Sequence, residues 1–272
     1  MFRYLQGKRV AFSKSNEEMT EGGTVKIGGT MGQYAITNAY QCVPVDDGTS
    51  FNEAASFFVN PLTALGLVEL VADDKGRSVV ITAAASQLSK MMIRLFQEQN
   101  IEVIATVRKE EQQKDLQENF GLKYVFNTQD EEFFNNFKTT VRELECKHLL
   151  ECIGGAIFGK IASLMPRKST IVLYGNLSRE SLSEIDPFVL IGSQIIIRGW
   201  LLNQWIEKKN LFSLLMTIRK VRNMLKENLA TEIQKEFDIK DIKAAKEYYE
   251  ENMSKGKIIL KPWGLQEDVQ KE

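Results

Sequence analysis

The sequence predicts an α/β protein in which a doubly wound parallel sheet is joined to a smaller β-rich segment. Three observations support this prediction. Short apolar runs alternate with helical patterns from residue 77 to residue 200. A run of small residues, Ala83 to Ser86, connects one apolar run to the helical pattern after it. The first 58 residues instead hold short apolar runs separated by glycines.

Length and charge limit the class of protein. The chain has 272 residues and a net charge of −1. That length suits one large or two modest domains. The charge provides no general attraction to nucleic acid or to an anionic membrane. No apolar run reaches the roughly 18 residues that a membrane span requires. We therefore expect no nucleic-acid partner and no membrane span.

Cysteine and histidine usage argues against a disulfide framework and a metal site. Cys42, Cys146 and Cys152 lie in three different segments, and His148 is the one histidine. None of them has metal-ligand spacing, so we expect no metal. Unpaired cysteines favour a reducing intracellular compartment. The first fifteen residues hold four basic side chains and no acid, which faintly resembles an import signal, so cytoplasm and mitochondrion both stay open. We read His148 as a strand residue.

Residues 1 to 58 are predicted to form part of a barrel or sandwich. The predicted strands are 8–12, 24–27, 33–36 and 41–45, with a polar loop at 14–23. A helical pattern follows from residue 52 to residue 73 and is interrupted at Asn60-Pro61. Proline suits the first turn of a helix, and Asn60 can cap its free N–H groups. For Asn60 and Thr63, capping and contact with a ligand pocket both remain open.

The stretch from Ser78 to Met92 is typical of the start of a dinucleotide-binding unit. A strand at 78–82, a turn of small residues and a helix at 87–99 follow one another. Small residues let the backbone approach a pyrophosphate, and the N–H groups at the helix start bind its charge. At glycine-motif spacing the chain has Ala83, Ser86 and Ser89 instead. An ordinary crossover without a ligand remains the alternative.

The rest of the sheet follows from the same alternation. Further strands are predicted at 103–107, 124–127, 149–152, 170–173 and 195–199, with helices at 110–120, 131–144 and 156–164. The run at 195–199 predicts a strand that is covered on both faces. Arg108 and Lys109 follow the second strand, where such folds read the adenosine ribose, and their charge favours the 2′-phosphate of NADPH.

The C-terminal part combines helices with one last strand. A basic amphipathic helix is predicted at 211–226. We interpret its lysines and arginines as a solvent-exposed face and not as a nucleic-acid-binding site. A helix at 239–253 and a strand at 257–260 follow.

The order of these parts resembles the zinc-free branch of the medium-chain dehydrogenase/reductase superfamily, the quinone oxidoreductase-like and enoyl reductase-like proteins. The matching segments are AASFFVNPLTALGLVE (54–69), TAAASQLSKMM (82–92), TVRKEEQ (106–112), ECIGG (151–155), LYGNLS (173–178) and MSKGKIILKP (253–262). The resemblance implies a truncated GroES-like β segment at 1–58 and a Rossmann nucleotide-binding domain at 59–200. Residues 201–272 would complete the β-rich domain.

The resemblance implies hydride transfer from NADPH to a quinone or a conjugated carbonyl, without zinc. The residues expected at the pyrophosphate are Ala85, Ser86, Gln87 and Leu88. Arg108 and Lys109 are expected at the 2′-phosphate. Those expected along the cofactor are Gly154, Gly155, Tyr174 and Gly175. Asn60, Thr63 and Trp200 are expected nearer the nicotinamide. Tyr174, Asn60 and Thr63 are candidate donors to an oxyanion, but no catalytic residue is assigned.

Two departures from the family pattern matter. Ser89 stands where the branch usually has its last glycine, and the resemblance implies a substantial stretch before the segment that matches Leu5 to Phe12, which this sequence does not contain. We therefore expect another polypeptide or a second copy to cover the strands between residues 8 and 45. Two functions remain open. The chain is either an NADPH-dependent reductase or a non-catalytic family member that serves as a structural or accessory subunit of a larger assembly. In the second case, binding of NADPH and its loss both remain open.

Overall fold

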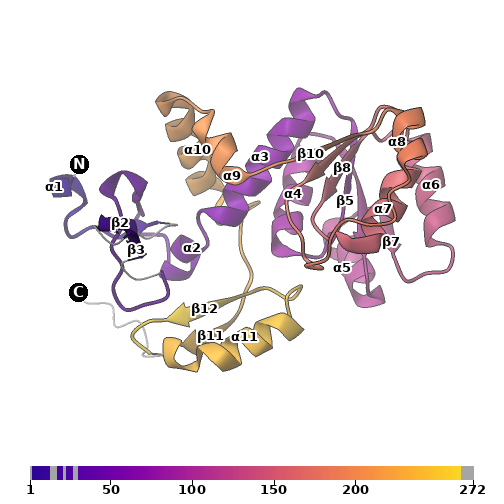
Figure 1. Cartoon of the computed structure of the whole chain (residues 1–272). Helices are drawn as coiled ribbons and strands as arrows, with labels where there is room; N and C mark the ends of the chain where they lie inside the picture. The colour runs from indigo at the N-terminus through magenta and orange to yellow at the C-terminus, as the bar shows by residue number, and fades with distance from the viewer. Residues whose placement is uncertain (1, 13–16, 21–22, 27–29, 265–272) are drawn as a thin grey trace. The chain divides into compact units, whose positions relative to one another are not determined.

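A computed structural model describes residues 2–12, 17–20, 23–26 and 30–264 of the chain. The chain divides into two compact units, one of residues 1–62 with 219–272 and one of residues 63–218. Figure 1 shows the elements of both units in chain order. The predicted boundaries lay after residues 58 and 200, so the larger unit extends 18 residues further (218 − 200) than the predicted nucleotide-binding domain.

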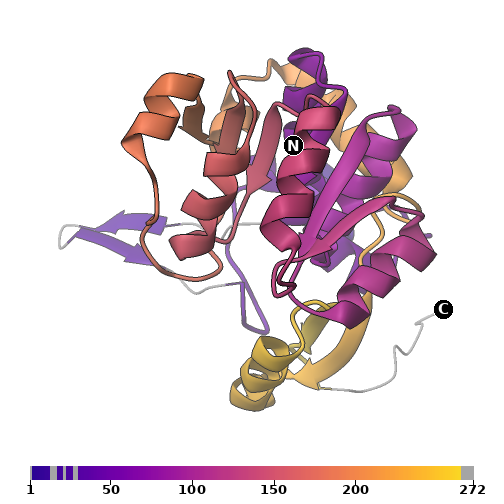
Figure 2. The ribbon, with the colours of Figure 1, turned by 90° about the vertical axis from the view of Figure 1, so that its right-hand side faces the viewer.

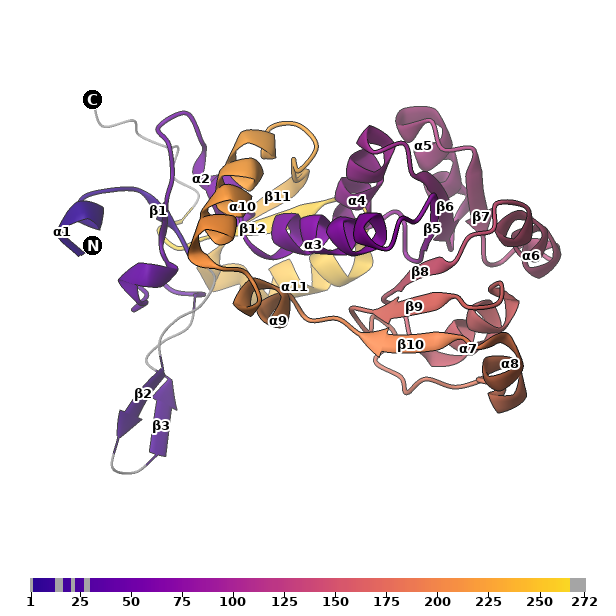
Figure 3. The same ribbon diagram turned by 90° about the horizontal axis from the view of Figure 1, so that it is seen from above.

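The larger unit is built on one parallel sheet of six strands. In spatial order the sheet reads β10-β9-β8-β5-β6-β7 (Figure 3). The strands are β5 (Ser78–Ile81), β6 (Glu102–Val107), β7 (Tyr124–Asn127), β8 (His148–Glu151), β9 (Thr170–Leu173) and β10 (Ile196–Gly199). Strand order reverses between β5 and β8, as it does in a doubly wound dinucleotide-binding fold. The predicted fold class is confirmed.

Helices cover both faces of this sheet, which is why β5 and β8 are buried along their whole length. On one face, α6 (Phe133–Glu143) and α7 (Gly155–Leu164) contribute Phe133, Phe137 and Phe158 to a buried cluster with the strands. On the other face lie α3 (Val59–Asp73) and α4 (Gln87–Glu98) (Figures 1 and 3). An ion pair of 2.9 Å between Lys90 and Asp115 joins α4 to α5 (Glu110–Phe120).

The last strand differs from its prediction. The apolar run at 195–199 was expected to be covered on both faces, but in β10 Ile196 is 58% exposed and Arg198 is also exposed. The reason is its position: β10 is the outer strand of the sheet and pairs with β9 alone. The neighbouring α8 (Pro187–Ser193) exposes Phe188 and Ile191 as well. The apolar run therefore predicted the strand correctly but predicted its burial wrongly.

The smaller unit contains three separate pairs of strands in its described residues. Antiparallel pairs join β1 (Val10–Ala11) to β4 (Val43–Pro44) and β2 (Glu17–Thr20) to β3 (Gly23–Lys26). A parallel pair joins β11 (Ile233–Asp238) to β12 (Lys257–Lys261), and α11 (Ile242–Glu251) packs on it (Figure 2).

Several predictions for this unit were wrong. Residues 33–36 form no strand, and Tyr34 and Ile36 are exposed, because an alternating pattern without a partner strand forms no ladder. Residues 17–20 of the predicted loop form β2, and residues 14–16, 21–22 and 27 lie outside the described residues. The strands predicted at 8–12 and 41–45 shorten to two residues each. A short helix, α1 (Phe2–Leu5), precedes β1.

The helical break also lies earlier than predicted. The helix α2 (Phe51–Ala55) begins with a capping box, in which the Ser50 hydroxyl accepts from the Glu53 N–H and the Glu53 carboxylate accepts from the Ser50 N–H. Because α3 already begins at Val59, Asn60 lies in its first turn instead of at its cap. After the sheet come α9 (Leu202–Glu207) and α10 (Leu211–Met224). The border between the two units falls inside α10.

Candidate functional site

The carboxyl ends of four neighbouring strands bring most of the predicted site residues to one edge of the sheet. The turn from Ala83 to Ser86 follows β5, and Arg108 with Lys109 follows β6. Gly154 and Gly155 come just after β8, and Tyr174 with Gly175 directly after β9. Since these strands are parallel and adjacent, their carboxyl ends lie side by side. In open α/β sheets this edge, where strand order reverses, is where ligands bind.

The turn into α4 is held by its own backbone and by Ser86. Ala83 adopts a left-handed φ of 48°, and the Ala84 N–H donates to the Thr106 carbonyl on β6 at 3.0 Å. The Ser86 hydroxyl caps the helix by accepting from the Ser89 N–H at 3.2 Å. Of the four residues expected at the pyrophosphate, Ser86 and Leu88 are half-buried, whereas Ala85 and Gln87 are buried.

Ser89, the departure from the glycine pattern, does not lie on the surface of the turn. It is fully buried, and its hydroxyl lies 2.9 Å from that of Ser86. On its other side lies the buried hydroxyl of Tyr174, which also faces the Cys152 thiol but makes no well-aligned hydrogen bond with a described residue. Burial raises the pKa of Tyr174 well above its usual value. The Tyr174 hydroxyl is therefore directed into the protein, which corrects its candidacy as an oxyanion donor.

The turn after β8 needs both of its glycines. Gly154 has φ 78° and Gly155 has φ 62°, in the left-handed region that side chains disfavour. A Cβ on Gly154 would lie 2.5 Å from the Asn176 Oδ1, and one on Gly155 would lie 2.6 Å from the Glu180 Oε2. The two glycines therefore allow the side chains of Asn176 and Glu180 to pack directly against the backbone of this turn.

A buried carboxylate holds this glycine turn in place. Glu151 accepts hydrogen bonds at its Oε1 from the Ile153 N–H at 2.5 Å and the Gly154 N–H at 2.9 Å. Burial raises the pKa of Glu151, and the two backbone donors offset part of that rise. Its buried Oε2 has no hydrogen bond with a described residue. Sequence reasoning missed this residue, although an acid ending an apolar strand was a signal that could have identified it.

The two predicted cations lie exposed beyond β6. The Arg108 N–H donates to the Gln112 Oε1 at 3.2 Å, but its guanidinium pairs with no described residue. The Lys109 ammonium lies 3.5 Å from the Glu111 carboxylate, and both of these side chains are largely exposed. An exposed ion pair of this length is weak, so both cations are available to a bound anion.

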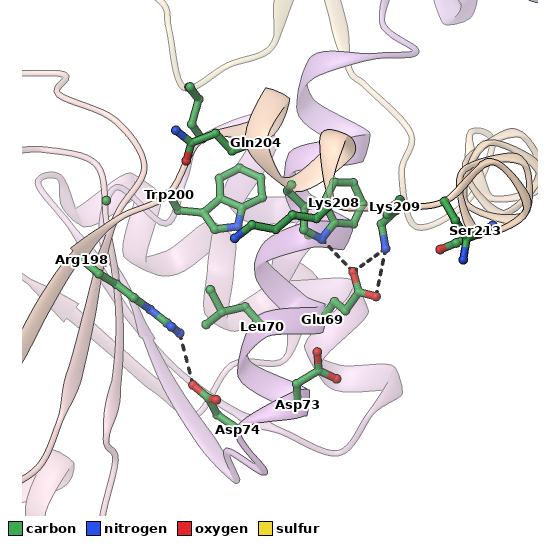
Figure 4. A pocket seen from close by; sticks show the side chains of 15 residues that line it. Glu69, Leu70, Asp73, Asp74, Arg198, Trp200, Gln204, Lys208, Lys209 and Ser213 are labelled. Carbon is green, nitrogen blue, oxygen red and sulfur yellow. Dashed lines mark hydrogen bonds and ion pairs between the residues drawn. The ribbon is translucent and has the colours of Figure 1, made fainter.

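Trp200 belongs to a different group of residues from the glycine turn. Its ring packs on α3 so closely that a Cβ on Gly66 would lie 2.5 Å from the Trp200 Cζ2. A groove of about 560 Å³ runs along this side, between α3, the end of β10 and α9 (Figure 4). In it the Glu69 carboxylate accepts from the Trp205 Nε1–H at 2.8 Å and pairs with Lys209 at 3.0 Å.

Arg198 and Asp74 close the far end of this groove with an ion pair of 3.3 Å (Figure 4). Sequence reasoning missed the groove, because its two sides are more than a hundred residues apart along the chain. Thr63 is buried in α3, and Asn60 lies in the smaller unit at the first turn of the same helix.

His148 lies at the opposite edge of the sheet, as the first residue of β8. Its Nε2 lies 3.4 Å from the Asp74 carboxylate. Burial lowers the pKa of His148, and Asp74 offsets part of that shift. The reading of His148 as a strand residue is confirmed. Among the described residues, no helix combines the length and the apolar character that crossing a membrane requires.

The chain matches no protein-family model. It is 28% identical over 184 residues to a mitochondrial enoyl-[acyl-carrier-protein] reductase of Caenorhabditis elegans, which covers 66% of this chain and 52% of that protein. An Arabidopsis thaliana protein of the same name is 26% identical over 183 residues, covering 65% of this chain and 48% of that protein. The chain is a homologue of these reductases. It spans about half of their length.

The comparison of folds agrees with this result. A solved structure described as a putative NADPH:quinone reductase of Mesorhizobium loti superposes with a TM-score of 0.81 at 24% identity, covering 96% of this chain and 72% of that one. An enoyl thioester reductase of Candida tropicalis gives a TM-score of 0.68 at 16% identity, covering 82% and 68%. The chain therefore shares the fold of these two reductase structures, which agrees with the fold expected from its sequence segments.

Proposed function

We propose that this protein is an NADPH-dependent oxidoreductase that transfers a hydride to a conjugated carbonyl compound or a quinone. The observation that carries the proposal is the edge of the sheet described above. There a helix start, a turn of two glycines and two exposed cations follow three adjacent strands. The homologous reductases, and a mycobacterial structural neighbour bound to NADPH, support the same reading.

The residues present fit a dinucleotide phosphate. The Ser86 hydroxyl is engaged with Ser89, so at the start of α4 the free backbone N–H groups of the first turn, that of Leu88 among them, would bind a pyrophosphate. The Gly154–Gly155 turn, packed against the side chains of Asn176 and Glu180, lies at the same edge of the sheet. Arg108 and Lys109 supply the positive charge that distinguishes a 2′-phosphate from a free ribose hydroxyl. Tyr174 and Gly175 would line the cofactor, and Asn60, Thr63 and Trp200 remain predicted contacts of the nicotinamide end.

The chemistry assigned to the chain is modest. Bound NADPH supplies a hydride from its nicotinamide ring. The chain holds the nucleotide by its phosphates, keeps the glycine turn rigid through Glu151, and places the two reactants against each other. Reducing an enoyl thioester also requires a donor to the developing oxyanion, and with the Tyr174 hydroxyl buried that donor is not identified.

The test is turnover. Purified chain is incubated with NADPH and either crotonyl-coenzyme A or a simple benzoquinone, and the loss of NADPH absorbance is recorded. We expect saturable oxidation with at least one of the two acceptors. The double variant Gly154→Ala, Gly155→Ala should abolish turnover while the Gly192→Ala variant retains it, because only the first pair lies in a crowded, left-handed turn. NADPH binding without turnover for either acceptor would favour the accessory-subunit alternative.

We also propose that the β-rich unit is covered by another polypeptide or a second copy. In support, β2 and β3 pair only with each other among the described strands, and Met31, Tyr34 and Ile36, which follow β3 in the chain, are exposed. We place the protein in a reducing compartment because Cys42, Cys146 and Cys152 are all free thiols. The names of the curated relatives favour the mitochondrion over the cytoplasm.

A further inference from the structure

The groove beside Trp200 has two walls of opposite charge. Its acidic side chains come from α3 and the residue after it, and its basic side chains come from β10 and from the end of α9 (Figure 4). The charged residues of the lining are Glu69, Asp73, Asp74, Arg198, Lys208 and Lys209. All the lining residues belong to the larger unit, so the groove is formed within that unit.

Two ion pairs connect the walls and leave one acid and one base unpaired. Glu69 pairs with Lys209 at 3.0 Å, and the pair of 3.3 Å described above closes the far end. The acid and the base that remain are Asp73 and Lys208. Both side chains are exposed, and neither makes an ion pair or a hydrogen bond with another residue drawn in Figure 4. The groove therefore keeps one free carboxylate and one free ammonium group on opposite walls.

The groove also has aromatic and apolar surface. The Lys209 ammonium lies 4.2 Å from the centre of the Trp205 ring, so that ring already carries a cation. Among the described residues, no cation stacks on the half-buried ring of Trp200. Leu70 lines the groove as well. Trp200 and Leu70 can therefore contact an apolar body that lies in the groove.

The charges of the lining decide what kind of ligand fits. Three acids and three bases leave no net charge, so the groove has no general attraction for a polyanion such as a phosphate ester. A divalent metal ion requires several oxygen ligands, and Asp73 alone is an unpaired carboxylate here. A molecule with one positive and one negative group would satisfy both free side chains. The volume of about 560 Å³ suits a small molecule.

We propose that this groove binds a free α-amino acid with an aromatic or large apolar side chain. Its ammonium group would face Asp73, its carboxylate would face Lys208, and its side chain would pack on Trp200. A free amino acid carries both charged groups and the side chain on one carbon, whereas each end of a peptide carries only one of the charges. Such binding requires no NADPH, so it can be measured whether or not the proposed reduction occurs.

The test separates the two charges of the ligand. Binding of L-phenylalanine is followed by tryptophan fluorescence in the Trp263→Phe variant, in which both remaining tryptophans line the groove. N-acetyl-L-phenylalanine keeps only the carboxylate, and L-phenylalaninamide keeps only the ammonium group. Each ligand is also titrated into Asp73→Asn and Lys208→Met. The control combines Asp130→Asn with Lys138→Met, which removes two exposed charges of the larger unit outside the groove.

We expect phenylalanine to bind with a Kd of about 1 mM, and each blocked analogue to bind about threefold to fivefold more weakly. Asp73→Asn should weaken the binding of phenylalanine by the same factor and leave that of the N-acetyl analogue unchanged. Lys208→Met should do the same for phenylalanine and leave that of the amide unchanged. These differences should shrink at high salt, and L-alanine should bind about tenfold more weakly than phenylalanine.

Three results would overturn the proposal. The first is the absence of saturable phenylalanine binding, both by fluorescence and by calorimetry. The second is a Kd that neither groove variant changes, since the ligand would then bind elsewhere. The third is a blocked analogue that binds as tightly as phenylalanine, because the groove would then recognise one charge only.

Discussion

At the scale of single residues, the first question is whether Ser89, which replaces the last glycine of the pattern, blocks the nucleotide site. Its side chain is fully buried and faces Ser86 and Tyr174, so it fills space beneath α4 and leaves the outer surface of the turn unchanged. A serine can replace the glycine here because the helix accommodates it against the residue that follows β9. In most dinucleotide-binding folds a glycine at this position lets the helix pack closely on the strand. In this chain the hydroxyl groups of Ser86, Ser89 and Tyr174 pack there instead.

Ser89→Gly should therefore affect stability more than affinity. Removing the side chain inside the first turn of α4 should lower the free energy of unfolding by about 1 kcal/mol, measured by urea titration. The Kd for NADPH should change by less than about threefold. Ser89→Ala, which keeps the helix propensity, is the control. A tenfold gain in affinity for the glycine variant would show that Ser89 obstructs the site.

His148 should make stability depend on pH. Burial lowers its pKa from 6.5, so just below pH 6.5 the unfolded chain binds more protons than the folded one. The stabilising effect is complete above pH 6.5 and is lost as the pH falls through the lowered folded pKa. Chemical denaturation between pH 5 and 7.5 should show this slope, and His148→Gln should flatten it.

The reference for that experiment is the wild type at pH 7.5, where His148 is neutral in both the folded and the unfolded state. Glu151 acts with the opposite sign, because its raised pKa makes the folded chain bind more protons above pH 4.5. An unchanged slope in the His148→Gln variant would show that other groups cause the pH dependence.

At the scale of elements, the sequence predicted the sheet far better than the β-rich unit. β7 and β9 match their predicted ranges, β5, β6 and β10 differ from theirs by one residue at one end, and β8 is displaced by one residue. Buried parallel strands are recognisable because helices on both faces require nearly continuous apolar runs. Two-residue strands such as β1 and β4 have no such signal, and the irregular segment around Tyr34 shows that alternation alone does not create a strand.

The parts of the site that come directly after the carboxyl ends of strands could be predicted from the sequence. Arg108, Lys109 and the Gly154–Gly155 turn could be placed from the order of strands alone. The roles of Glu151 and Tyr174 could not, because they depend on which direction a side chain points after its strand ends. The groove around Trp200 and Glu69 depends on contacts between distant segments, which no local pattern contains.

The packing of α7 against the loop before α8 yields a matched pair of substitutions. A Cβ on Gly159 would lie 2.2 Å from backbone atoms of Ser183 and Glu184, whereas a Cβ on Gly192 would meet nothing within 4 Å. Gly159→Ala should therefore lower the free energy of unfolding by about 1–3 kcal/mol. Gly192→Ala should raise it by up to about 1 kcal/mol, because alanine favours the helix. Thermal and urea unfolding measure both, and equal effects would contradict the packing described.

At the scale of the whole molecule, the exposed edges of the small sheets predict association. We expect the purified chain to form a dimer or larger species, measured by size-exclusion chromatography with light scattering, because Met31, Tyr34 and Ile36 are exposed and the two-stranded sheets have open outer edges among the described strands. Replacing these three residues with serine should shift the population toward the monomer. A stable monomer that is unaffected by the substitutions would contradict self-association and leave a different polypeptide as the cover.

The nucleotide site is the claim on which the proposed reduction depends. The most direct measurement is the Kd of the whole chain for NADPH and for NADH, followed by nicotinamide fluorescence, in the wild type, in Arg108→Ala with Lys109→Ala, and in Lys114→Ala as a control with an exposed side chain on α5. We predict that NADPH binds about tenfold or more tightly than NADH, and that the double variant alone loses this preference. Absence of NADPH binding, or a preference that survives removal of both cations, would contradict the site.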